Sequence, residues 1–434
     1  MNREEGKIIR ETIKQSDLVR TSRAGDAFHY RWVARFCLNM IKPGSLITSV
    51  TIEQSKETEK PGECVMDMAV YSAVDEEEYV DYYQMKHSEA RTDKHMTLGE
   101  LRNTVEGFSD RFKSHKDDDT NEKEKYYVVT NRRIDQKLHS VVLRIAKSQD
   151  ANKRIKDQLI RYTELGEEDL REFCNNLILQ GGEGNYEDQF YSLIGETGRL
   201  ISGVDSTDIV NKLITMIQAR VLPNDRSEIT RATVLNQFGC SSERVLYPAP
   251  SNFEKLDNAV VRDEYTRLAD AVKESEQTKI ITATGGLGKS IFTGMLPDLL
   301  GEEYLTVIYD CFGNGTYRNR LKFRHRHQDA LVQIANELAD IGLCEPLIPT
   351  HTEPGWISEA FWDRLSYAVA RFRKLHHNGR LVIVVDAADN AEMAAEIHGH
   401  LAFAGDLIQQ GLPDGCTLVM LSRPERKHLA TSWN

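Results

Sequence analysis

Residues 278–290 have the sequence TKIITATGGLGKS, in which a short apolar run leads into a glycine-rich turn. The turn matches the G-x-x-x-x-G-K-[ST] pattern of phosphate-binding loops, except that Ala283 takes the place of the first glycine. Small residues are needed there because consecutive N–H groups must turn inward around phosphate oxygens. With the helical pattern of residues 290–300 that follows, the stretch predicts a strand, a phosphate-binding loop and a helix.

Two side chains of this loop have specific expected roles. Lys289 would reach the β and γ phosphate oxygens of ATP, and the Ser290 hydroxyl would ligate Mg²⁺. The expected nucleotide-binding set of the loop and the first helical turn is Gly285, Gly286, Leu287, Gly288, Lys289, Ser290 and Ile291.

A second apolar strand, LVIVVDAADN at residues 381–390, ends in Asp386, where a carboxylate would meet the Mg²⁺ held by the phosphate loop. Asp389 is the best candidate to orient or deprotonate the attacking water, and the alternative is that it caps the following helix. Arg423 follows the strand at 417–422, where it would sense the γ-phosphate or lie in an ordinary strand-end turn. Strands and helices alternate over 263–422, which predicts an α/β domain with a parallel, doubly wound sheet.

The motifs GGLGKS, DAADN and LSR resemble those of the STAND class of signal-transducing NTPases, which includes the NACHT and NB-ARC proteins. The resemblance covers residues 250–434, and Arg262 is similar to the linker arginine that precedes the nucleotide site. Asn390 stands where a glutamate is usual, so a slow ATP switch is expected rather than a motor. The resemblance further implies a C-terminal sensor, absent from this sequence, that binds a phage protein, and ATP-dependent assembly into a homo-oligomer, expected to be a tetramer.

A second constellation lies near the N-terminus. Asp67 and Gln84 lie on stretches with strong β composition, and Lys86 shares a strand face with Gln84 because side chains alternate. An acid that holds Mg²⁺, a neighbouring side chain and carbonyl, and a lysine that orients water are the parts of a metal-dependent phosphodiesterase. Glu53 is either a second metal ligand or a surface acid. An ordinary solvated strand explains the lysine equally simply.

The order of elements over residues 20–160 resembles the PD-(D/E)xK restriction-endonuclease-like fold, in its Q-x-K variant. That resemblance implies a Mg²⁺-dependent double-stranded DNA endonuclease, with Asp67, Gln84 and Glu53 as metal ligands and Lys86 as a catalytic residue. Such domains are found fused to STAND NTPases in bacterial antiviral proteins.

The chain between the two constellations has a different pattern. Residues 163–243 are expected to be helical, including a helix over 167–179, and Pro248 and Pro250 then mark a linker. The nearly all-charged residues 114–125 are expected to form a loop. The predicted domains are a nuclease-like domain over 1–160, a helical connector over 161–247 and an NTPase domain over 248–434.

Composition limits the classes of function. With 434 residues and a net charge of -12, the chain lacks the basic field of a DNA-coating protein, although a local basic groove would suffice for an enzyme. The basic pairs Arg132-Arg133 and Lys153-Arg154 either grip phosphates or lie on a solvated face. Apolar runs are too short to span a bilayer, and the 7 scattered cysteines include no CxxC pair, which predicts a cytoplasmic protein with reduced thiols.

The sequence therefore predicts an antiphage protein whose ATP switch controls a Mg²⁺-dependent DNA endonuclease. One alternative is a regulatory ATPase whose N-terminal domain only binds partners. A translocating nuclease would need brisk DNA-stimulated ATP hydrolysis, which Asn390 disfavours.

Overall fold

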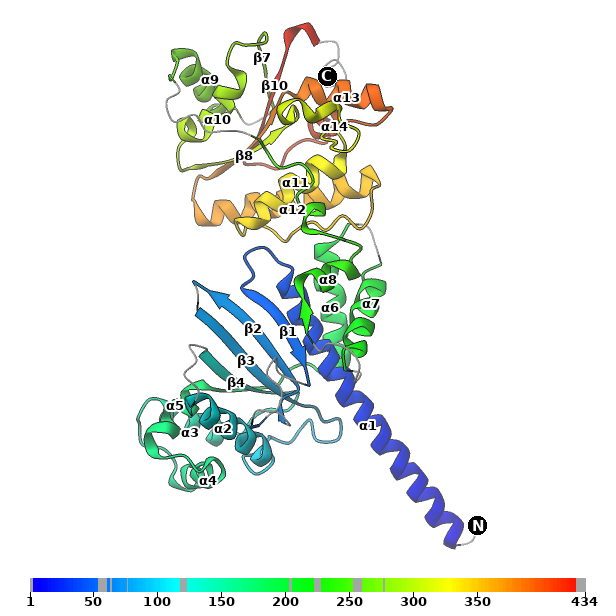
Figure 1. Cartoon of the computed structure of the whole chain (residues 1–434), viewed down its shortest axis with the longest axis vertical. Helices are drawn as coiled ribbons and strands as arrows, with labels where there is room; N and C mark the ends of the chain where they lie inside the picture. Colours follow the sequence, from blue (N-terminus) through cyan, green and yellow to red (C-terminus); the bar gives the residue numbers. More distant parts are fainter. Residues whose placement is uncertain are drawn as a thin grey trace. The chain divides into compact units, whose positions relative to one another are not determined.

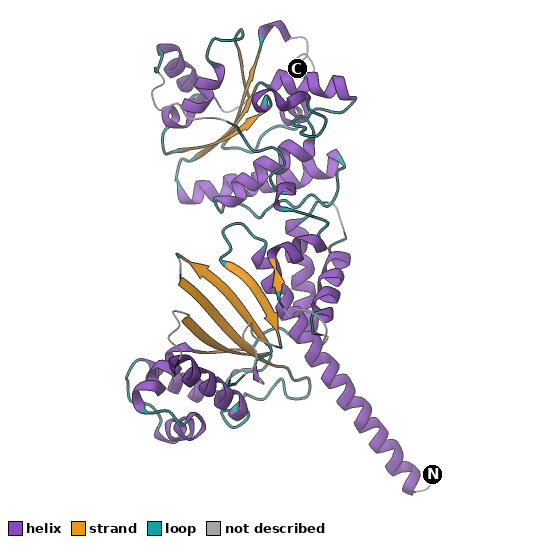
Figure 2. Ribbon diagram, in the orientation of Figure 1, coloured by secondary structure: helices purple, strands orange, loops and turns teal. Residues whose placement is uncertain are grey.

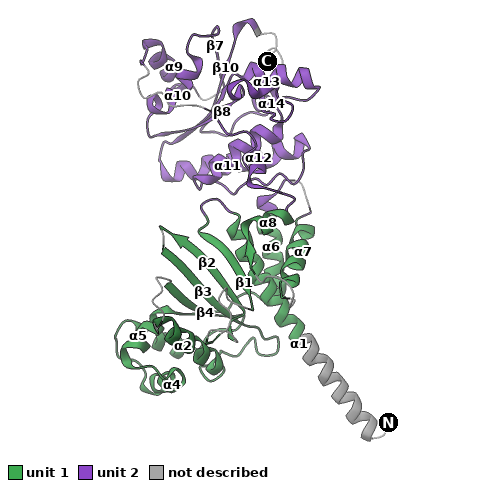
Figure 3. Ribbon diagram, in the orientation of Figure 1, with its two compact units in different colours: residues 1–41, 45–197, 206–237 green, residues 42–44, 198–205, 238–434 purple. Residues whose placement is uncertain are grey.

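The computed structural model describes residues 3–53, 61–62, 65–75, 77–117, 123–202, 205–221, 228–252, 260–275 and 278–426, with side chains from residue 22 onward (Figure 1). The chain divides into two compact units (Figure 3). Unit 1 comprises residues 1–41, 45–197 and 206–237, and unit 2 comprises residues 42–44, 198–205 and 238–434. Each unit combines a sheet with helices, so the predicted α/β fold class is confirmed.

Unit 1 is built on a six-stranded mixed sheet with the order β5-β4-β3-β2-β1-β6 (Figure 2). Its strands are β1 (Ile47–Ile52), β2 (Met68–Val74), β3 (Glu77–Lys86), β4 (Lys123–Thr130), β5 (Leu177–Gly181) and β6 (Ile229–Thr230). Strands β1, β2 and β3 pair antiparallel, whereas β3, β4 and β5 pair parallel. Lys86 pairs with Thr130, and Thr130 pairs with Gly181, so the carboxyl ends of these three parallel strands are level.

Helices cover both faces of this sheet. They are α1 (Arg3–Met40), α2 (Arg102–Asp117), α3 (Gln136–Ala146), α4 (Lys153–Thr163), α5 (Glu167–Asn176), α6 (Tyr186–Leu200), α7 (Ser206–Ala219) and α8 (Arg231–Gln237). Tyr82 and Tyr126 are buried in one core with apolar side chains of α2, α3, α4 and α5. Tyr83, on the opposite face of β3, packs against Phe36 of α1 at 5.1 Å between ring centroids.

Two expectations for unit 1 are wrong. The helix predicted over 167–179 ends at Asn176, and the next residues form β5, because Leu177 and Leu179 pair with Tyr126 and Val128 of β4 and are buried in the core. A run of three such residues is too short to distinguish a buried strand from a helix end.

The charged stretch 114–125 is in regular structure at both of its described ends. Helix α2 continues to Asp117 and β4 begins at Lys123. Lys116 of α2 donates hydrogen bonds to Asp169 at 2.7 Å and to Glu172 at 2.8 Å, and both of these acids lie on α5. Pairing across elements allows a nearly all-charged sequence to stay in regular structure.

Unit 2 is built on a four-stranded parallel sheet with the order β7-β10-β9-β8. Its strands are β7 (Lys279–Thr282), β8 (Tyr304–Asp310), β9 (Arg380–Asp386) and β10 (Cys416–Ser422). Its α-helices are α9 (Asp263–Lys273), α10 (Lys289–Leu300), α11 (His327–Asp340), α12 (Pro354–Leu375), α13 (Ala388–His398) and α14 (Phe403–Gln409). One core joins the sheet to α11, α12 and α14, and another joins it to α9 and α10, as expected of a doubly wound sheet.

Residues 161–247, the predicted connector, contribute α5–α8 with β5 and β6, and most of them belong to unit 1. That they form a separate domain stays a prediction. Within the described residues, no helix is both long enough and apolar enough to cross a bilayer. The cysteines at 37, 174, 240, 311, 344 and 416 are free thiols, and Cys64 lies outside the described residues.

Candidate functional site

In unit 1 the strands bring Asp67 and Gln84 together. Asp67 directly precedes β2, and its N–H donates to the Tyr83 carbonyl at 2.9 Å, which extends the β2–β3 pairing by one residue. The Asp67 Oδ2 atom accepts hydrogen bonds from Gln84 Nε2 at 2.6 Å and from the Met85 N–H at 2.5 Å. The carboxylate is therefore held at a fixed place beside the end of β3.

His29 of α1 and Glu53 at the end of β1 complete what we call the carboxylate site, together with Asp67, Gln84 and Lys86. His29 Nε2 lies 3.2 Å from the Met85 carbonyl oxygen and 3.9 Å from Asp67 Oδ2. The Glu53 N–H donates to the Asp67 carbonyl at 2.9 Å. Desolvation and then the charge of Asp67 raise the pKa of Glu53, while His29 opposes the shift, so these groups lie within electrostatic reach.

Lys86 is the last residue of β3 and is half-buried. The strand is regular from Glu77 to Lys86, so Gln84 and Lys86 share a face of the sheet, as the alternation predicts. The sequence-predicted residues of this site are thus brought to one end of the sheet. The sequence does not assign His29 to this site, because its position on a helix gives no sign of which strand it meets.

The donor atoms of the carboxylate site suit Mg²⁺. Asp67, Glu53 and the Gln84 side chain offer hard oxygen donors, which this ion prefers, and Mg²⁺ commonly keeps several waters and takes one or two carboxylates. Over the described part of the chain, no three His, Cys, Asp or Glu side chains form a ready metal-binding group. A partly hydrated ion on the Asp67 and Glu53 carboxylates is the form of Mg²⁺ binding that these donors fit.

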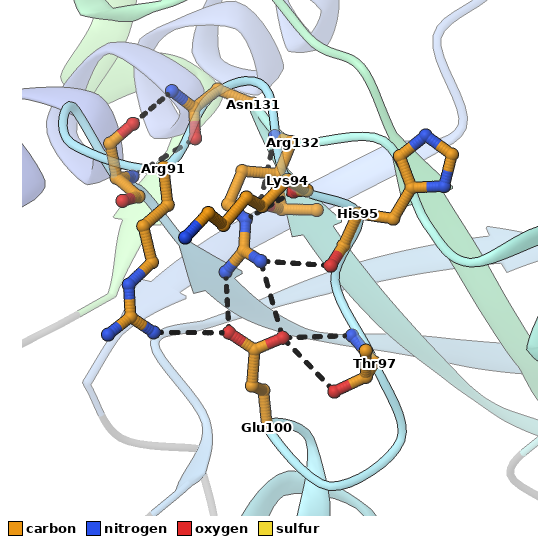
Figure 4. A network of polar contacts seen from close by, with 9 residues as sticks. Arg91, Lys94, His95, Thr97, Glu100, Asn131 and Arg132 are labelled. Carbon is orange, nitrogen blue, oxygen red and sulfur yellow. Dashed lines mark hydrogen bonds and ion pairs between the residues drawn. The ribbon is translucent and has the colours of Figure 1, made fainter.

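Next to this site, a polar network organises the loop that follows β3 (Figure 4). Arg132, whose exposed fraction is 4%, donates to the carbonyls of Lys94 at 2.8 Å and His95 at 3.0 Å, and to Glu100 at 2.8 Å. The hydrogen bond from Arg132 is the main cause that lowers the pKa of Glu100 to about 2. Arg132 is thus engaged within the protein, whereas Arg133 is exposed, so the two members of this basic pair differ in role.

In unit 2 the phosphate loop, residues 283–290, joins β7 to α10. Gly286 and Gly288 have φ values of 80° and 90°, which favour glycine. A Cβ at Gly288 would lie 2.3 Å from the Tyr265 hydroxyl oxygen, so the backbone passes close to α9. Lys289 Nζ donates to the Ala283 carbonyl and, at 3.0 Å, to the Thr284 carbonyl, which curls the loop around the ammonium group.

Ser290 and Asp386 meet although 96 positions separate them. The Ser290 hydroxyl donates to Asp386 Oδ2 at 2.8 Å. Desolvation raises the pKa of Asp386 to about 6, although the hydrogen bond from Ser290 opposes this. A buried carboxylate of this kind is stabilised by a cation, so the Ser290 hydroxyl and the Asp386 carboxylate fit the Mg²⁺ that accompanies ATP.

Arg262 and Arg423 approach the phosphate loop from separate segments. Arg262 Nη1 donates to the Leu287 carbonyl at 3.3 Å. The positive charge of Arg423 helps to lower the pKa of Lys289, second to desolvation, which places Arg423 near the ammonium group. The side chains of Leu287 and Ile291 are 54% and 37% exposed, so the structure leaves them accessible to a ligand.

Asp389 is buried in the first turn of α13, with an exposed fraction of 1%, and its charge acts on Lys289. The N-cap residue of that helix is Ala387, with a φ of 54°, so Asp389 does not occupy the capping position considered for it. Sequence reasoning missed Tyr265, whose hydroxyl donates to the Gly288 carbonyl at 3.2 Å. The sequence feature that could have pointed to Tyr265 is its position one helical turn after Arg262.

The chain has distant similarity to solved structures. No family model matches the chain, and neither does any curated protein. Among solved structures, the Acinetobacter baumannii Cap4 SAVED/CARF-domain containing receptor matches with 10% identity and a TM-score of 0.32, over 85% of this chain and 66% of that one. The same receptor with the cyclic trinucleotide 3'3'3'-cAAA matches with 10% identity and a TM-score of 0.32, over 92% of this chain and 70% of that one.

A Cap4 SAVED/CARF-domain containing receptor from Moraxella osloensis matches with 11% identity and a TM-score of 0.32, over 85% of this chain and 66% of that one. The chain thus spans slightly less than two thirds of the length of that protein. TM-scores of this size do not establish a shared fold, and function depends on the sites themselves.

Proposed function

We propose that the chain is an ATP-gated, Mg²⁺-dependent DNA endonuclease that acts in defence against bacteriophage. The observation that supports this is that one chain holds two assembled sites suited to phosphate chemistry. In unit 1 the Gln84 Nε2 atom lies 2.6 Å from Asp67 Oδ2, and in unit 2 the Ser290 hydroxyl oxygen lies 2.8 Å from Asp386 Oδ2.

In unit 1, Asp67 and Glu53, with the Gln84 side chain, would hold Mg²⁺, which supplies charge stabilisation and a more acidic bound water. Lys86, on the same strand face as Gln84, would orient the attacking water or stabilise negative charge on the phosphate. The substrate in this proposal is a phosphodiester bond of double-stranded DNA.

In unit 2, Lys289 would exchange its two carbonyl acceptors for the β and γ phosphates of ATP. Ser290 and Asp386 would hold the accompanying Mg²⁺, Asp389 would orient water, and Arg423 would sense the γ-phosphate. The resemblance to STAND proteins supplies the rest of the proposal, which is a phage protein as trigger and a homo-oligomer, a tetramer, as the active form.

The test is plasmid cleavage with Mg²⁺, ATP and phage lysate, with ATP binding measured in parallel. We expect Lys86→Ala to abolish cleavage and to leave ATP binding intact, and Lys289→Ala to abolish both. Lys374→Ala, which changes an exposed lysine of α12, serves as the control and should cut like the wild type. If Lys86→Ala cuts as well as the wild type, the nuclease assignment is wrong.

A second candidate function is a regulatory ATPase whose unit 1 binds partners without cutting DNA. It is favoured by the two hydrogen bonds that Asp67 Oδ2 already accepts, and by the lack of a ready three-residue metal group in the described regions. Mg²⁺ or Mn²⁺ titration, followed by thermal shift in the wild type and in Asp67→Ala, separates the two functions. An equal response in both proteins would favour the regulator.

A further inference from the structure

We infer that a basic pocket beside α3 binds the phosphodiester backbone of duplex DNA. The inference rests on the proposed endonuclease function, because it adds a second contact to the same substrate. The pocket has a volume of about 550 Å³, and the residues that matter here are Arg133, His139, Ser140, Arg144, Lys147 and Gly181.

The charge of this pocket is opposite to that of the chain as a whole. Arg133, Arg144 and Lys147 are cationic, and among the described residues that line the pocket none is acidic. The nearby Asp135 accepts a hydrogen bond from the Lys137 N–H at 2.7 Å at the start of α3. A chain with a net charge of -12 therefore presents a local positive surface suited to phosphates.

The fold holds these cations in place. Leu138, Val141, Val142 and Ile145 bury one face of α3 in the core, so the face that bears His139 and Arg144 points away from the core. Across the pocket, a Cβ on Gly181 would lie 2.7 Å from the Arg132 carbonyl oxygen. The end of β5 thus lies directly against the segment that carries Arg133.

The pocket lies at the same edge of the sheet as the carboxylate site. Gly181 pairs with Thr130, and Thr130 pairs with Lys86 at the ends of three successive parallel strands. Neighbouring strands are about 4.8 Å apart, so Gly181 and Lys86 are separated by roughly 10 Å along this edge. Phosphates recur every ~3.4 Å of axis along one DNA strand. A few nucleotides of one DNA strand are therefore long enough to contact both the pocket and the carboxylate site.

The spread of the cations favours a polymer over a small anion. Arg133 precedes α3 and Lys147 directly follows it, so the 11 residues and ~16 Å of this helix lie between them, and Arg144 lies in its last turn. Charges spread over such a distance match a line of phosphates, whereas a single phosphate needs donors that converge.

The test is binding of a fluorescent DNA duplex in EDTA, where cleavage does not interfere, as a function of salt. The pocket variant is Arg133→Gln with Lys147→Gln, and the control is Arg371→Gln with Lys374→Gln, an exposed pair of α12 with the same change in charge. The plot of log K against log salt has a negative slope, and each lost phosphate contact reduces the steepness of that slope by about 0.9. We expect a slope less steep by about 2 and affinity at least ~10-fold weaker in the pocket variant, with the control like the wild type.

Equal slopes in the pocket variant and the control would overturn the inference, as would a wild-type protein that binds no duplex. Melting temperatures of both variants establish that they fold. The two proposals fail differently. Cleavage by Lys86→Ala refutes the nuclease and leaves the binding result unchanged, whereas wild-type binding by the pocket variant refutes the pocket alone.

Discussion

The carboxylate site of unit 1 and the phosphate loop of unit 2 are built in opposite ways. The phosphate loop is one continuous segment of mostly exposed residues whose path depends on positive φ at Gly286 and Gly288. The carboxylate site takes its side chains from α1, the end of β1, the start of β2 and the end of β3, and its Gln84 is only 7% exposed.

This difference determines which changes each site tolerates. A loop that binds through its backbone fails when a Cβ prevents the backbone from adopting its path. A site built around one fixed carboxylate responds instead to charge, because a second acid brought to hydrogen-bond distance from it could not ionise freely. Three substitutions test this contrast.

The largest expected effect is that of Gly288→Ala. Its φ of 90° strains any other residue, and the added Cβ would lie 2.3 Å from the Tyr265 hydroxyl oxygen. Left-handed strain costs about 1–2 kcal/mol, and with the close contact we expect ATP affinity to fall about 100-fold. Fluorescent-nucleotide titration measures it. Gly294→Ala, within α10 and without neighbours inside 4 Å, is the control, and equal affinities in the two variants would refute the backbone cradle.

The next effect in size is that of Gln84→Glu. It replaces the amide that donates to Asp67 at 2.6 Å with a second carboxylate. Without metal we expect about 2 kcal/mol less stability, or roughly 4–8 °C in melting temperature, and recovery when Mg²⁺ is added. Gln84→Ala removes the same hydrogen bond without adding charge and should not recover. Insensitivity of the glutamate variant to EDTA would place residue 84 away from the metal.

The smallest effect is that of Asp386→Asn. Because desolvation raises the pKa of Asp386 from 3.8 to about 6, the folded state binds a proton more tightly than the unfolded state. Stability is therefore lost as pH rises from about 4 to 6, and the loss is complete above that window. At pH 7.5 without nucleotide we expect D386N to be more stable by about 1 kcal/mol, roughly 2–4 °C.

That advantage should vanish near pH 4 and reverse with Mg²⁺ and ATP, which stabilise only a protein that binds them. Glu302→Gln removes an exposed acid of the same unit and should show no such pH dependence. If D386N melts at a lower temperature than the wild type at pH 7.5, burial of the Asp386 carboxylate does not destabilise the protein, and the prediction is wrong.

Sequence reasoning anticipated best the positions that depend on neighbouring residues. The phosphate loop is eight consecutive residues, and Asp67 directly precedes the strand that pairs with the strand of Gln84, in the chain order that was expected. It could not place His29 against Met85, because the angle at which a helix crosses a sheet depends on packing across the whole face.

The same limit explains the basic residues. Arg132 and Arg133 are adjacent and chemically identical, yet one is buried by Glu100 and two carbonyls and the other lines the basic pocket. Neither composition nor spacing distinguishes them, since the difference arises from a loop that closes over only one of them. Strand β5 was misassigned for a related reason, as Leu177 becomes a strand residue only by pairing with β4.

The strand order of unit 2 has a consequence for biosynthesis. Strand β7, which leads into the phosphate loop, is at the edge of the described sheet and pairs with β10, so Thr282 meets Ser422. On a ribosome that adds 5–20 residues per second, the partner of β7 emerges roughly 7–28 s later. Unit 1, whose last residue is 237, is synthesised well before that. The nascent chain therefore completes the proposed cutting unit before the unit proposed to control it can close its sheet.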